Sequence, residues 1–219
     1  LPGTLWYVTL VNIGVGNFTA AVLTERFNTW LSPQALLFVG IAGGLGSDIN
    51  IGDVVVATKM YGIHRGKQAP EGFVVRSDAW RASYRLEQVA RHALRVAEYR
   101  VHFKPIAIED VVHTSAEPAI ARRIRERYDD VVAIEMESGG IAQTAHLAGT
   151  LDTLIIRGIS DKADNKKDDT GRSTAAHQAA AAAIAVLREL QPRGTLPQHS
   201  GDRSEEHTSE LQSQVLISY

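Results

Sequence analysis

The chain of 219 residues contains no cysteine. This absence excludes disulfide bonds and thiolate metal sites, and we expect a protein of a reducing compartment such as the cytoplasm. No apolar run reaches the length of a bilayer span, and the N-terminus has no signal-peptide pattern, so we expect no membrane association. The net charge of −2 gives no general attraction to nucleic acid, which we do not expect as a partner either.

Hydrophobic residues make up 44% of the chain, which is enough for the core of a single domain. Short apolar runs alternate with segments of helical periodicity. We interpret residues 5–11, 35–40, 53–58, 104–108, 131–134 and 154–159 as strands, residues 20–30, 77–98, 118–128, 139–147 and 174–190 as helices, and residues 61–73 as a polar loop. This alternation predicts an α/β fold with a central, mostly parallel mixed sheet flanked by helices.

The character of the sequence changes after Gln191. We therefore interpret residues 1–191 as one domain and residues 192–219 as a disordered or non-native tail, because 201–219 is polar and lacks a core pattern until its short apolar end. Residues 203–213 resemble translated sequencing-adapter sequence, and a native disordered tail is the alternative.

Acidic side chains follow two of the predicted strands. Glu135 and Glu137 come directly after the strand at 131–134, and Asp161 comes after the strand at 154–159. Ligands of open parallel sheets bind at the carboxyl ends of the strands, so two acids from two strand ends can face one small ligand. The alternative is structural, since acids are also common at helix N-termini as caps.

Two glycine turns and one basic cluster are further candidates for ligand binding. Gly14 and Gly16 follow the first strand, where a lone Gly-x-Gly is weak evidence for phosphate binding and a plain tight turn is the more frequent explanation. The turn at 41–46 allows close approach of backbone amides to a ligand, or is a structural turn. Arg65 and Lys67 can meet an anionic substituent of a ligand, or are simply solvated.

Three pieces of the sequence, in this order, resemble the purine nucleoside phosphorylase and uridine phosphorylase superfamily. They are residues 40–45 with 51–56, residues 133–138, and residues 157–164. Within the superfamily the chain is most similar to the methylthioadenosine/S-adenosylhomocysteine nucleosidases and related bacterial nucleosidase domains. The resemblance implies a nucleoside phosphorylase-like fold and cleavage of an N-glycosidic bond.

The resemblance implies a role for each matching residue. Asp161 matches the catalytic aspartate that protonates N7 of the leaving purine. Glu137 matches the glutamate that holds the ribose hydroxyls and stabilises the oxocarbenium-like state, while Glu135 is expected in structural hydrogen bonds. The remaining substrate contacts that it implies are Met136 on the sugar, Ser160 orienting Asp161, and Ala42, Gly43, Val111, Val112 and Ala163 around the ligand.

The residues at the end of the predicted strand at 35–40 indicate whether water or phosphate is the nucleophile. Phosphorylases of the superfamily hold phosphate with an arginine and a serine at the strand end before the glycine turn. Phe38 and Ile41 stand at those positions here, and neither side chain can donate a hydrogen bond to an oxyanion. Water is therefore the expected nucleophile, and phosphate is the alternative.

The resemblance implies a purine nucleoside as substrate, such as methylthioadenosine or S-adenosylhomocysteine. One alternative is an adenine-nucleotide (AMP or ATP) nucleosidase effector domain, in which Arg65 and Lys67 bind the phosphates. Another is a non-catalytic ligand-binding module. We expect no cofactor and no metal, because the histidines lack metal-ligand company.

The family also implies a homo-oligomer. Its members open with a further strand before the segment at residue 5, and that opening supplies an acid that helps to activate the attacking water. We therefore expect the domain to be N-terminally incomplete and poorly active as residues 1–219.

Overall fold

The computed structural model describes residues 6–63, 65–70, 72–109, 124, 126–162, 169–193 and 214–218. Over these residues the main sheet has eight strands, β1 (Tyr7–Val11), β2 (Ala35–Gly44), β3 (Val54–Gly62), β6 (Asp78–Arg81), β7 (Val101–Ile108), β8 (Ala133–Glu135), β9 (Asp152–Asp161) and β10 (Gln214–Ser218). The helices are α1 (Asn17–Leu31), α2 (Tyr84–Ala93) with a 3-10 turn (Leu94–Val96), α4 (Ser138–Ala148) and α5 (Asp169–Glu189). The predicted α/β class is confirmed.

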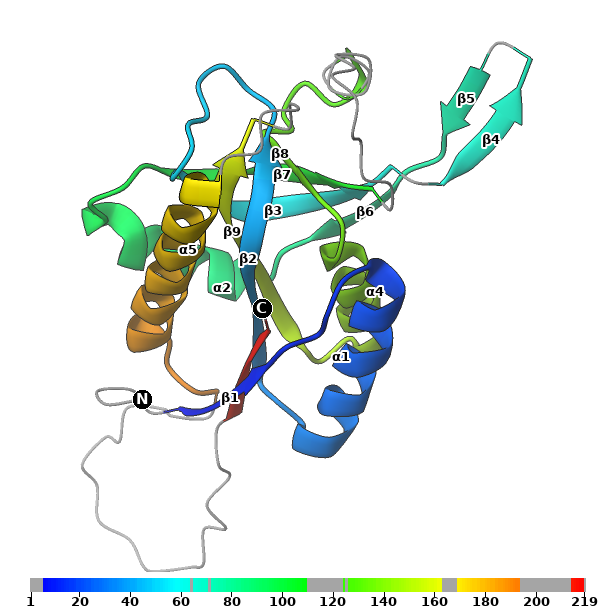
Figure 1. The fold of residues 1–219 in the computed structure, drawn as a ribbon. Helices are drawn as coiled ribbons and strands as arrows, with labels where there is room; N and C mark the ends of the chain where they lie inside the picture. Colours follow the sequence, from blue (N-terminus) through cyan, green and yellow to red (C-terminus); the bar gives the residue numbers. More distant parts are fainter. Residues whose placement is uncertain are drawn as a thin grey trace, which may run out of the picture.

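The helices cover both faces of the sheet, with α1 and α4 on one side and α5 and α2 on the other (Figure 1). Alternate residues of β2 explain this sandwich. Leu36 and Phe38 pack in the core on the α1 and α4 side, whereas Leu37 and Val39 pack in the core on the α5 side. A strand buried on both faces reads as a continuous apolar run. Within the described parts of the chain, none of the helices combines the length and apolarity that a bilayer span needs.

Five strands close on themselves. β2 pairs in parallel with β9, β9 pairs antiparallel with β3, β3 pairs in parallel with β7, β7 pairs in parallel with β8, and β8 pairs antiparallel with β2. The sheet is therefore mixed, as predicted, and near its end β2 has β8 on one edge and β9 on the other.

The segment between β3 and α2 differs from prediction. Residues expected to form a polar loop form the hairpin β4 (Gly66–Ala69) and β5 (Gly72–Val75), which projects from the body of the protein (Figure 1). The helix predicted at 77–98 begins later, because residues 78–81 instead pair along the edge of β3 as β6 and bury Trp80. Ser83 then caps α2 by accepting a hydrogen bond from the Leu86 amide.

Helix α5 begins at Asp169, before the predicted start at residue 174, and packs closely against β9. A methyl group at Gly158 would collide with the backbone of Ala175, and one at Gly171 would lie 2.6 Å from the Ser160 carbonyl oxygen. Two glycines thus let the first turns of α5 lie directly against the end of β9.

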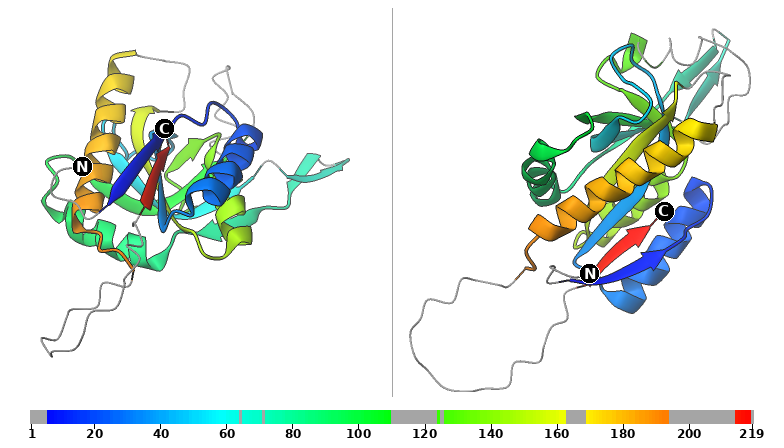
Figure 2. Two further views of the ribbon diagram at one scale, coloured as in Figure 1. Left: turned by 90° about the horizontal axis from the view of Figure 1, so that it is seen from below. Right: turned by 60° about the vertical axis from the view of Figure 1, so that its left-hand side comes forward.

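The C-terminal strand β10 lies between β1 and β2 and is parallel to both (Figure 2). Residues 214–218 of the predicted disordered or non-native tail thus form a strand in the structure. The reason is that Val215 and Ile217 alternate in the manner of a strand and join the core on the α5 side. The interpretation of the tail as non-native stays a prediction. Residues 194–213 of the predicted tail lie outside the described residues.

Candidate active site

The end of β2 separates the two acidic strand ends. Gly43 pairs with Ile134 of β8 on one side and with Asp161 of β9 on the other. Neighbouring strands are about 4.8 Å apart, so β8 and β9 stand about two strand spacings from each other here. The structure thus brings the two predicted acidic segments to one end of the sheet, with the last residues of β2 between them. Ala42 and Gly43, which were predicted in a turn at 41–46, belong to this strand, which continues to Gly44.

A bulge aims the side chains at the end of β9. The register shifts so that Ala42 pairs with Ile159 and Gly43 pairs with Asp161, which leaves Ser160 as the extra residue. Ser160 is buried, and its hydroxyl donates a 2.7 Å hydrogen bond to Asp161 Oδ2. The same hydroxyl lies 3.4 Å from the Ala42 carbonyl oxygen. The bulge therefore places a fixed hydroxyl against a carboxylate that remains partly exposed.

The turn before β3 supports this end of β9 from the other side. The Gly52 amide donates to the Ile159 carbonyl, and the Ile159 amide donates to the Asp53 carbonyl, both at 2.8 Å. The Asp53 carboxylate in turn accepts from the Asn50 amide at 2.9 Å and contacts His102 Nε2 at 2.7 Å. This turn, fixed by a buried pair of ionisable side chains, holds the backbone immediately before Ser160.

Glu135 organises the other acidic segment from within. Its carboxylate accepts hydrogen bonds from the amides of Glu137 and Ser138, each at 3.1 Å, and also from the Ser138 hydroxyl. Its side chain is 2% exposed and receives Arg157 Nη2 at 2.6 Å. Glu135 thus satisfies donors at the N-terminus of α4, and the expectation of structural hydrogen bonds is confirmed.

Arg157 lies in the middle of β9 and is almost fully buried. Its guanidinium stacks 3.9 Å from the centroid of the Phe38 ring and lies 3.9 Å from Glu137 Oε2. Gly40, which pairs with Arg157 in the sheet, has no side chain to occupy this space, and a methyl group there would collide with the guanidinium. Arg157 Nε has no hydrogen-bond partner among the described residues.

Glu137 occupies the N-cap position of α4, without a capping hydrogen bond from its side chain, and has charged neighbours. Burial, followed by repulsion from the neighbouring Glu135 carboxylate, raises the pKa of Glu137 above its usual value. The Arg157 charge and hydrogen bonds from the Gly16 and Met136 amides act in the opposite direction. The Glu137 side chain is 21% exposed, so it can still reach a ligand.

The loop between β1 and α1 approaches this carboxylate because the starts of α1 and α4 pack closely. The Asn17 side chain accepts a hydrogen bond from the Gly140 amide at 3.0 Å. A methyl group at Gly140 would collide with the Asn17 backbone, and one at Gly139 would lie 2.8 Å from Asn17 Oδ1. Gly16 itself has φ of 92°, a conformation that favours glycine.

The other predicted site residues lie in different parts of the structure or outside its described residues. Met136 is partly exposed between Glu135 and Glu137. Arg65, at the base of the hairpin, pairs with Asp78 at 2.7 Å, and Lys67 on β4 is exposed. Val111, Val112 and Ala163 lie outside the described residues.

Two residues that the structure brings to the site were not predicted from the sequence. Arg157 was seen only as part of a motif, although an arginine inside an apolar strand is itself a signal, since an arginine is almost never fully buried unless paired. Gly16 was weighed as a turn residue. No local pattern indicates that its amide would reach a glutamate 121 positions later in the chain.

Comparisons with known proteins give the family of the chain. Residues 3–191 match the family model described as the phosphorylase superfamily. A 5′-methylthioadenosine/S-adenosylhomocysteine nucleosidase of Chromohalobacter salexigens is 32% identical over 171 residues, which cover 74% of this chain and 69% of that protein.

Solved structures show the same likeness. The nucleosidase of that name from Neisseria meningitidis, in complex with methylthio-immucillin-A, superposes with a TM-score of 0.71 at 29% identity and covers 81% of this chain and 79% of its own. A Helicobacter pylori relative, an aspartate-to-asparagine mutant with 5′-methylthioadenosine in the active site, has a TM-score of 0.70 at 25% identity, with coverage of 81% and 78%. The chain belongs to the phosphorylase superfamily.

Proposed function

We propose that this protein is an enzyme that hydrolyses the N-glycosidic bond of an adenine nucleoside such as methylthioadenosine or S-adenosylhomocysteine. The observation that carries the proposal is the pairing of Gly43 with both acidic segments, which places Glu137 and Asp161 on either side of one strand end. The similarity to proteins named as nucleosidases for these two substrates supports it.

Asp161 acts on the leaving base. Breaking the bond leaves negative charge on the purine, and a carboxyl group that delivers a proton to N7 makes the base a better leaving group. Ser160 donates its hydrogen to Oδ2 of this carboxyl group, which fixes the rotation of the side chain. The second oxygen then faces the ligand in one orientation.

Glu137 acts on the sugar. As a carboxylate it accepts hydrogen bonds from the ribose hydroxyls, and its negative charge stabilises the positive charge that develops on the ring. The Glu135–Arg157 pair fixes the backbone of Glu137, and Arg157 helps to keep it ionised despite its burial. Met136, next to Glu137 and partly exposed, supplies an apolar contact for the sugar.

Water is the nucleophile in this proposal. Phe38, at a position where phosphorylases carry a phosphate-holding side chain, is buried beneath the Arg157 guanidinium and offers no donor. Ile41, the second position, is equally apolar. A phosphate ion at this strand end would therefore depend on backbone amides alone, which favours hydrolysis over phosphorolysis.

One assay tests the proposal. The purified protein is incubated with methylthioadenosine, S-adenosylhomocysteine, adenosine, AMP or ATP, each with and without phosphate, and free adenine is quantified. We expect adenine and free sugar from the nucleosides, at rates that do not change with phosphate. Formation of a sugar 1-phosphate in proportion to added phosphate would replace hydrolysis with phosphorolysis. Ligand binding without adenine release would indicate the non-catalytic module.

Cytoplasmic location remains a proposal that follows from the absence of cysteine, and assembly into a homo-oligomer remains one that follows from the family resemblance. Light scattering on the eluting protein tests the second. A monomer that releases adenine would show that the assembly is not needed for the reaction.

A further inference from the structure

Ser138 is a fully buried residue at the first position of α4. Its amide lies 3.2 Å from Glu135 Oε1 and 3.1 Å from Glu135 Oε2, and its hydroxyl donates a hydrogen bond to Oε1. The mechanism proposed above gives this side chain no role. Because a hydroxyl has a single hydrogen and this one is donated to Glu135, an influence of Ser138 on the reaction must pass through Glu135.

The two oxygens of the Glu135 carboxylate are held by different side chains. Oε2 receives Arg157 Nη2 at 2.6 Å and the Glu137 amide at 3.1 Å. Oε1 receives the Ser138 hydroxyl, which is the one side-chain donor that the described residues supply to this oxygen. A carboxylate that is bonded at both oxygens cannot turn about its last side-chain bond without breaking one of these contacts. The Ser138 hydroxyl therefore fixes the orientation of Glu135.

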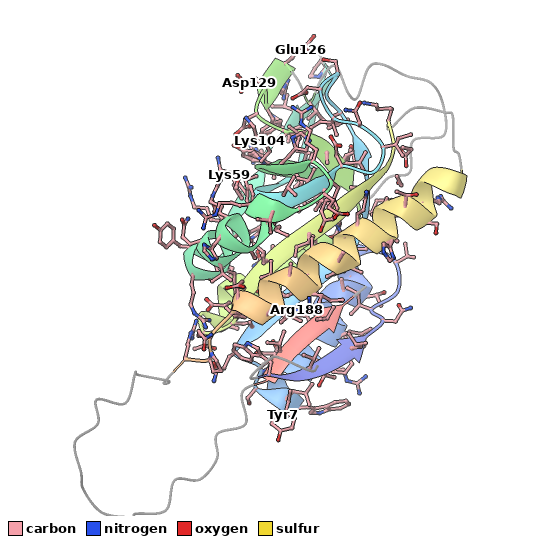
Figure 3. The ribbon with its side chains drawn as sticks, turned by 90° about the vertical axis from the view of Figure 1, so that its left-hand side faces the viewer. Tyr7, Lys59, Lys104, Glu126, Asp129 and Arg188 are labelled. Carbon is pink, nitrogen blue, oxygen red and sulfur yellow. The ribbon has the colours of Figure 1, made fainter. Side chains whose placement is uncertain are left out.

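Arg157 shares one nitrogen between two carboxylates. Its Nη2 lies 2.6 Å from Glu135 Oε2 and 3.9 Å from Glu137 Oε2. Lys104 on β7 and Arg188 on α5 are exposed cations at the surface (Figure 3), whereas Arg157 is almost fully buried. Solvent therefore screens the Arg157 charge poorly, and small changes in its position alter its interaction with each carboxylate. The orientation of Glu135 thus decides how close the guanidinium stays to Glu137.

Two charged side chains act on Glu137 from the neighbouring strands. Burial and then repulsion from Glu135 on β8 raise the pKa of Glu137, while Arg157 on β9 and two backbone amides act in the opposite direction. Neither α1 nor α4 has an acidic residue in its first turn, and Asp161 lies on the other side of β2. Arg157 is therefore the cation that opposes the repulsion between the two glutamates.

We propose that Ser138 is a positioning residue for Glu137 in the proposed nucleosidase reaction. Its hydroxyl fixes the Glu135 carboxylate in the orientation that leaves Arg157 Nη2 close to Glu137. Without the hydroxyl, the carboxylate can turn both oxygens toward the guanidinium, in the bidentate arrangement that arginine and carboxylate groups favour. Arg157 then moves away from Glu137. The consequence for the rate rests on the proposed function, whereas the consequence for the ionisation of Glu137 exists without substrate.

The experiment removes the hydroxyl alone. Ser138→Ala deletes one oxygen, and alanine is favourable in a helix. Thr144→Val is the matched control, because Thr144 is a buried hydroxyl of the same helix that donates to the Gly140 carbonyl instead. The Glu137 carboxyl is titrated by NMR in protein with labelled glutamate, and its signal is assigned with Glu137→Gln. We expect the pKa of Glu137 to rise further in Ser138→Ala, because the cation has moved away, and to stay unchanged in Thr144→Val.

Adenine release provides a second readout. Because the proposed role on the sugar needs an ionised Glu137, the acidic limb of the pH–rate profile should move to higher pH in Ser138→Ala. On that limb the rate should fall by ~3-fold or more relative to the plateau, and the plateau itself should change by less than ~2-fold. A loss of stability would lower the rate without moving the limb. Ser138→Thr retains the hydroxyl and should retain the wild-type limb.

Two results would overturn the role of Ser138. One is an unchanged titration of Glu137 in Ser138→Ala, and the other is an equal shift in Ser138→Ala and in Thr144→Val or Ser138→Thr, which would assign the effect to packing. The NMR titration also separates this inference from the proposed function. A protein that releases no adenine, but in which the Glu137 titration shifts as expected, would contradict the nucleosidase activity and support the action of Ser138 on Glu137.

Discussion

The two acidic residues of the site stand in contrasting surroundings. Glu137 has another carboxylate and a buried arginine beside it, and its backbone amide is held by Glu135. Asp161 ends a strand, is oriented by the neutral hydroxyl of Ser160, and depends on a bulge for its direction. In the proposed mechanism, the group that acts on the sugar is therefore controlled by charge, and the group that acts on the base is controlled by backbone geometry.

This difference fits the two proposed roles, which are stabilisation of positive charge on the sugar by Glu137 and delivery of a proton to the base by Asp161. A group that stabilises positive charge must stay ionised, so a nearby cation is useful and loss of that cation is harmful. A group that delivers a proton must be able to change protonation, and a neutral donor fixes its position without committing it to one state. Substitutions on the two sides should accordingly fail in different ways.

The largest effect is expected on the base side. Asp161→Asn retains the shape and removes the transferable proton, so adenine release should fall by about 10³- to 10⁴-fold. Substrate affinity should change far less, as measured by binding of methylthioadenosine to the variant. Asp129→Asn, at an exposed position, is the control for loss of one carboxylate. A residual rate above a tenth of the original would remove Asp161 from the proposed role.

Glu137→Gln tests the sugar side and its charge. We expect a loss of ~10²- to 10³-fold in adenine release. Because the pKa of Glu137 is raised, the wild-type rate should fall on acidification at a higher pH than for an ordinary glutamate, and the variant should lack this limb. The pH–rate profiles of the two proteins provide the measurement.

The same raised pKa predicts an opposite effect on stability. The folded protein binds the Glu137 proton more tightly than the unfolded chain does, so this contribution to stability is complete at low pH and is lost as pH rises through the folded pKa. Glu137→Gln should therefore melt at a higher temperature than wild type at pH 7 and not at pH 4. Glu25→Gln, which is exposed on α1, should show no such difference.

Another variant tests Glu137 indirectly, through the position of the neighbouring Arg157. Gly40→Ala should push the Arg157 guanidinium away from Glu135, which costs about 1–3 kcal/mol and lowers the rate by ~10-fold or more. Gly149→Ala, after α4, meets no neighbouring atom but has φ of 68°, so it should cost about 1–2 kcal/mol of stability at unchanged rate. Equal rates for both variants would show that the position of Arg157 is irrelevant to Glu137.

The contrast between the surroundings of Glu137 and those of Asp161 can be predicted from the sequence only in part. Glu137 and Asp161 could be found because each follows an apolar run, and parallel strands present their ends at one edge. The charge environment of Glu137 could not, because Gly16 and Arg157 reach it through pairings that no local pattern contains. The beginning of α2 was predicted too early for a similar reason. Residues 78–81 pair with the edge of β3 as a strand, so the helix begins only after them.

The neighbour of β1 was the least predictable element. Five residues with two alternating apolar positions are too short for a periodic signal, and their partner lies 207 positions away in the pairing of Tyr7 with Gln214. Compositional bias in the preceding segment argued for disorder. The pairing of β10 with β1 and β2 is a property of the folded sheet, so only the three-dimensional arrangement reveals it.

A smaller effect is expected where backbone geometry supports Asp161. His102→Gln weakens the hold on Asp53, whose backbone and neighbour Gly52 bond to Ile159. We expect a loss of about 1–2 kcal/mol in stability and a ~3-fold fall in kcat with little change in KM, because ligand contacts remain. His146→Gln, exposed on α4, is the matched control. A change confined to KM would contradict a role for this pair in positioning Asp161.

The smallest effect is expected far from either acid, at the hairpin. Arg65 is 68% exposed and its ion pair with Asp78 is of a kind worth about 0–1 kcal/mol, so Arg65→Ala should leave the melting temperature nearly unchanged. The double variant with Lys67→Ala should release adenine from methylthioadenosine within about 2-fold of the wild-type rate, since an uncharged 5′ substituent offers these cations nothing to bind. The same variant assayed with AMP and ATP sharpens the result. A selective loss on the nucleotides would bring the hairpin into the site and make phosphate-bearing substrates the better description, whereas equal rates on all substrates would leave Glu137 and Asp161 as the charges that matter.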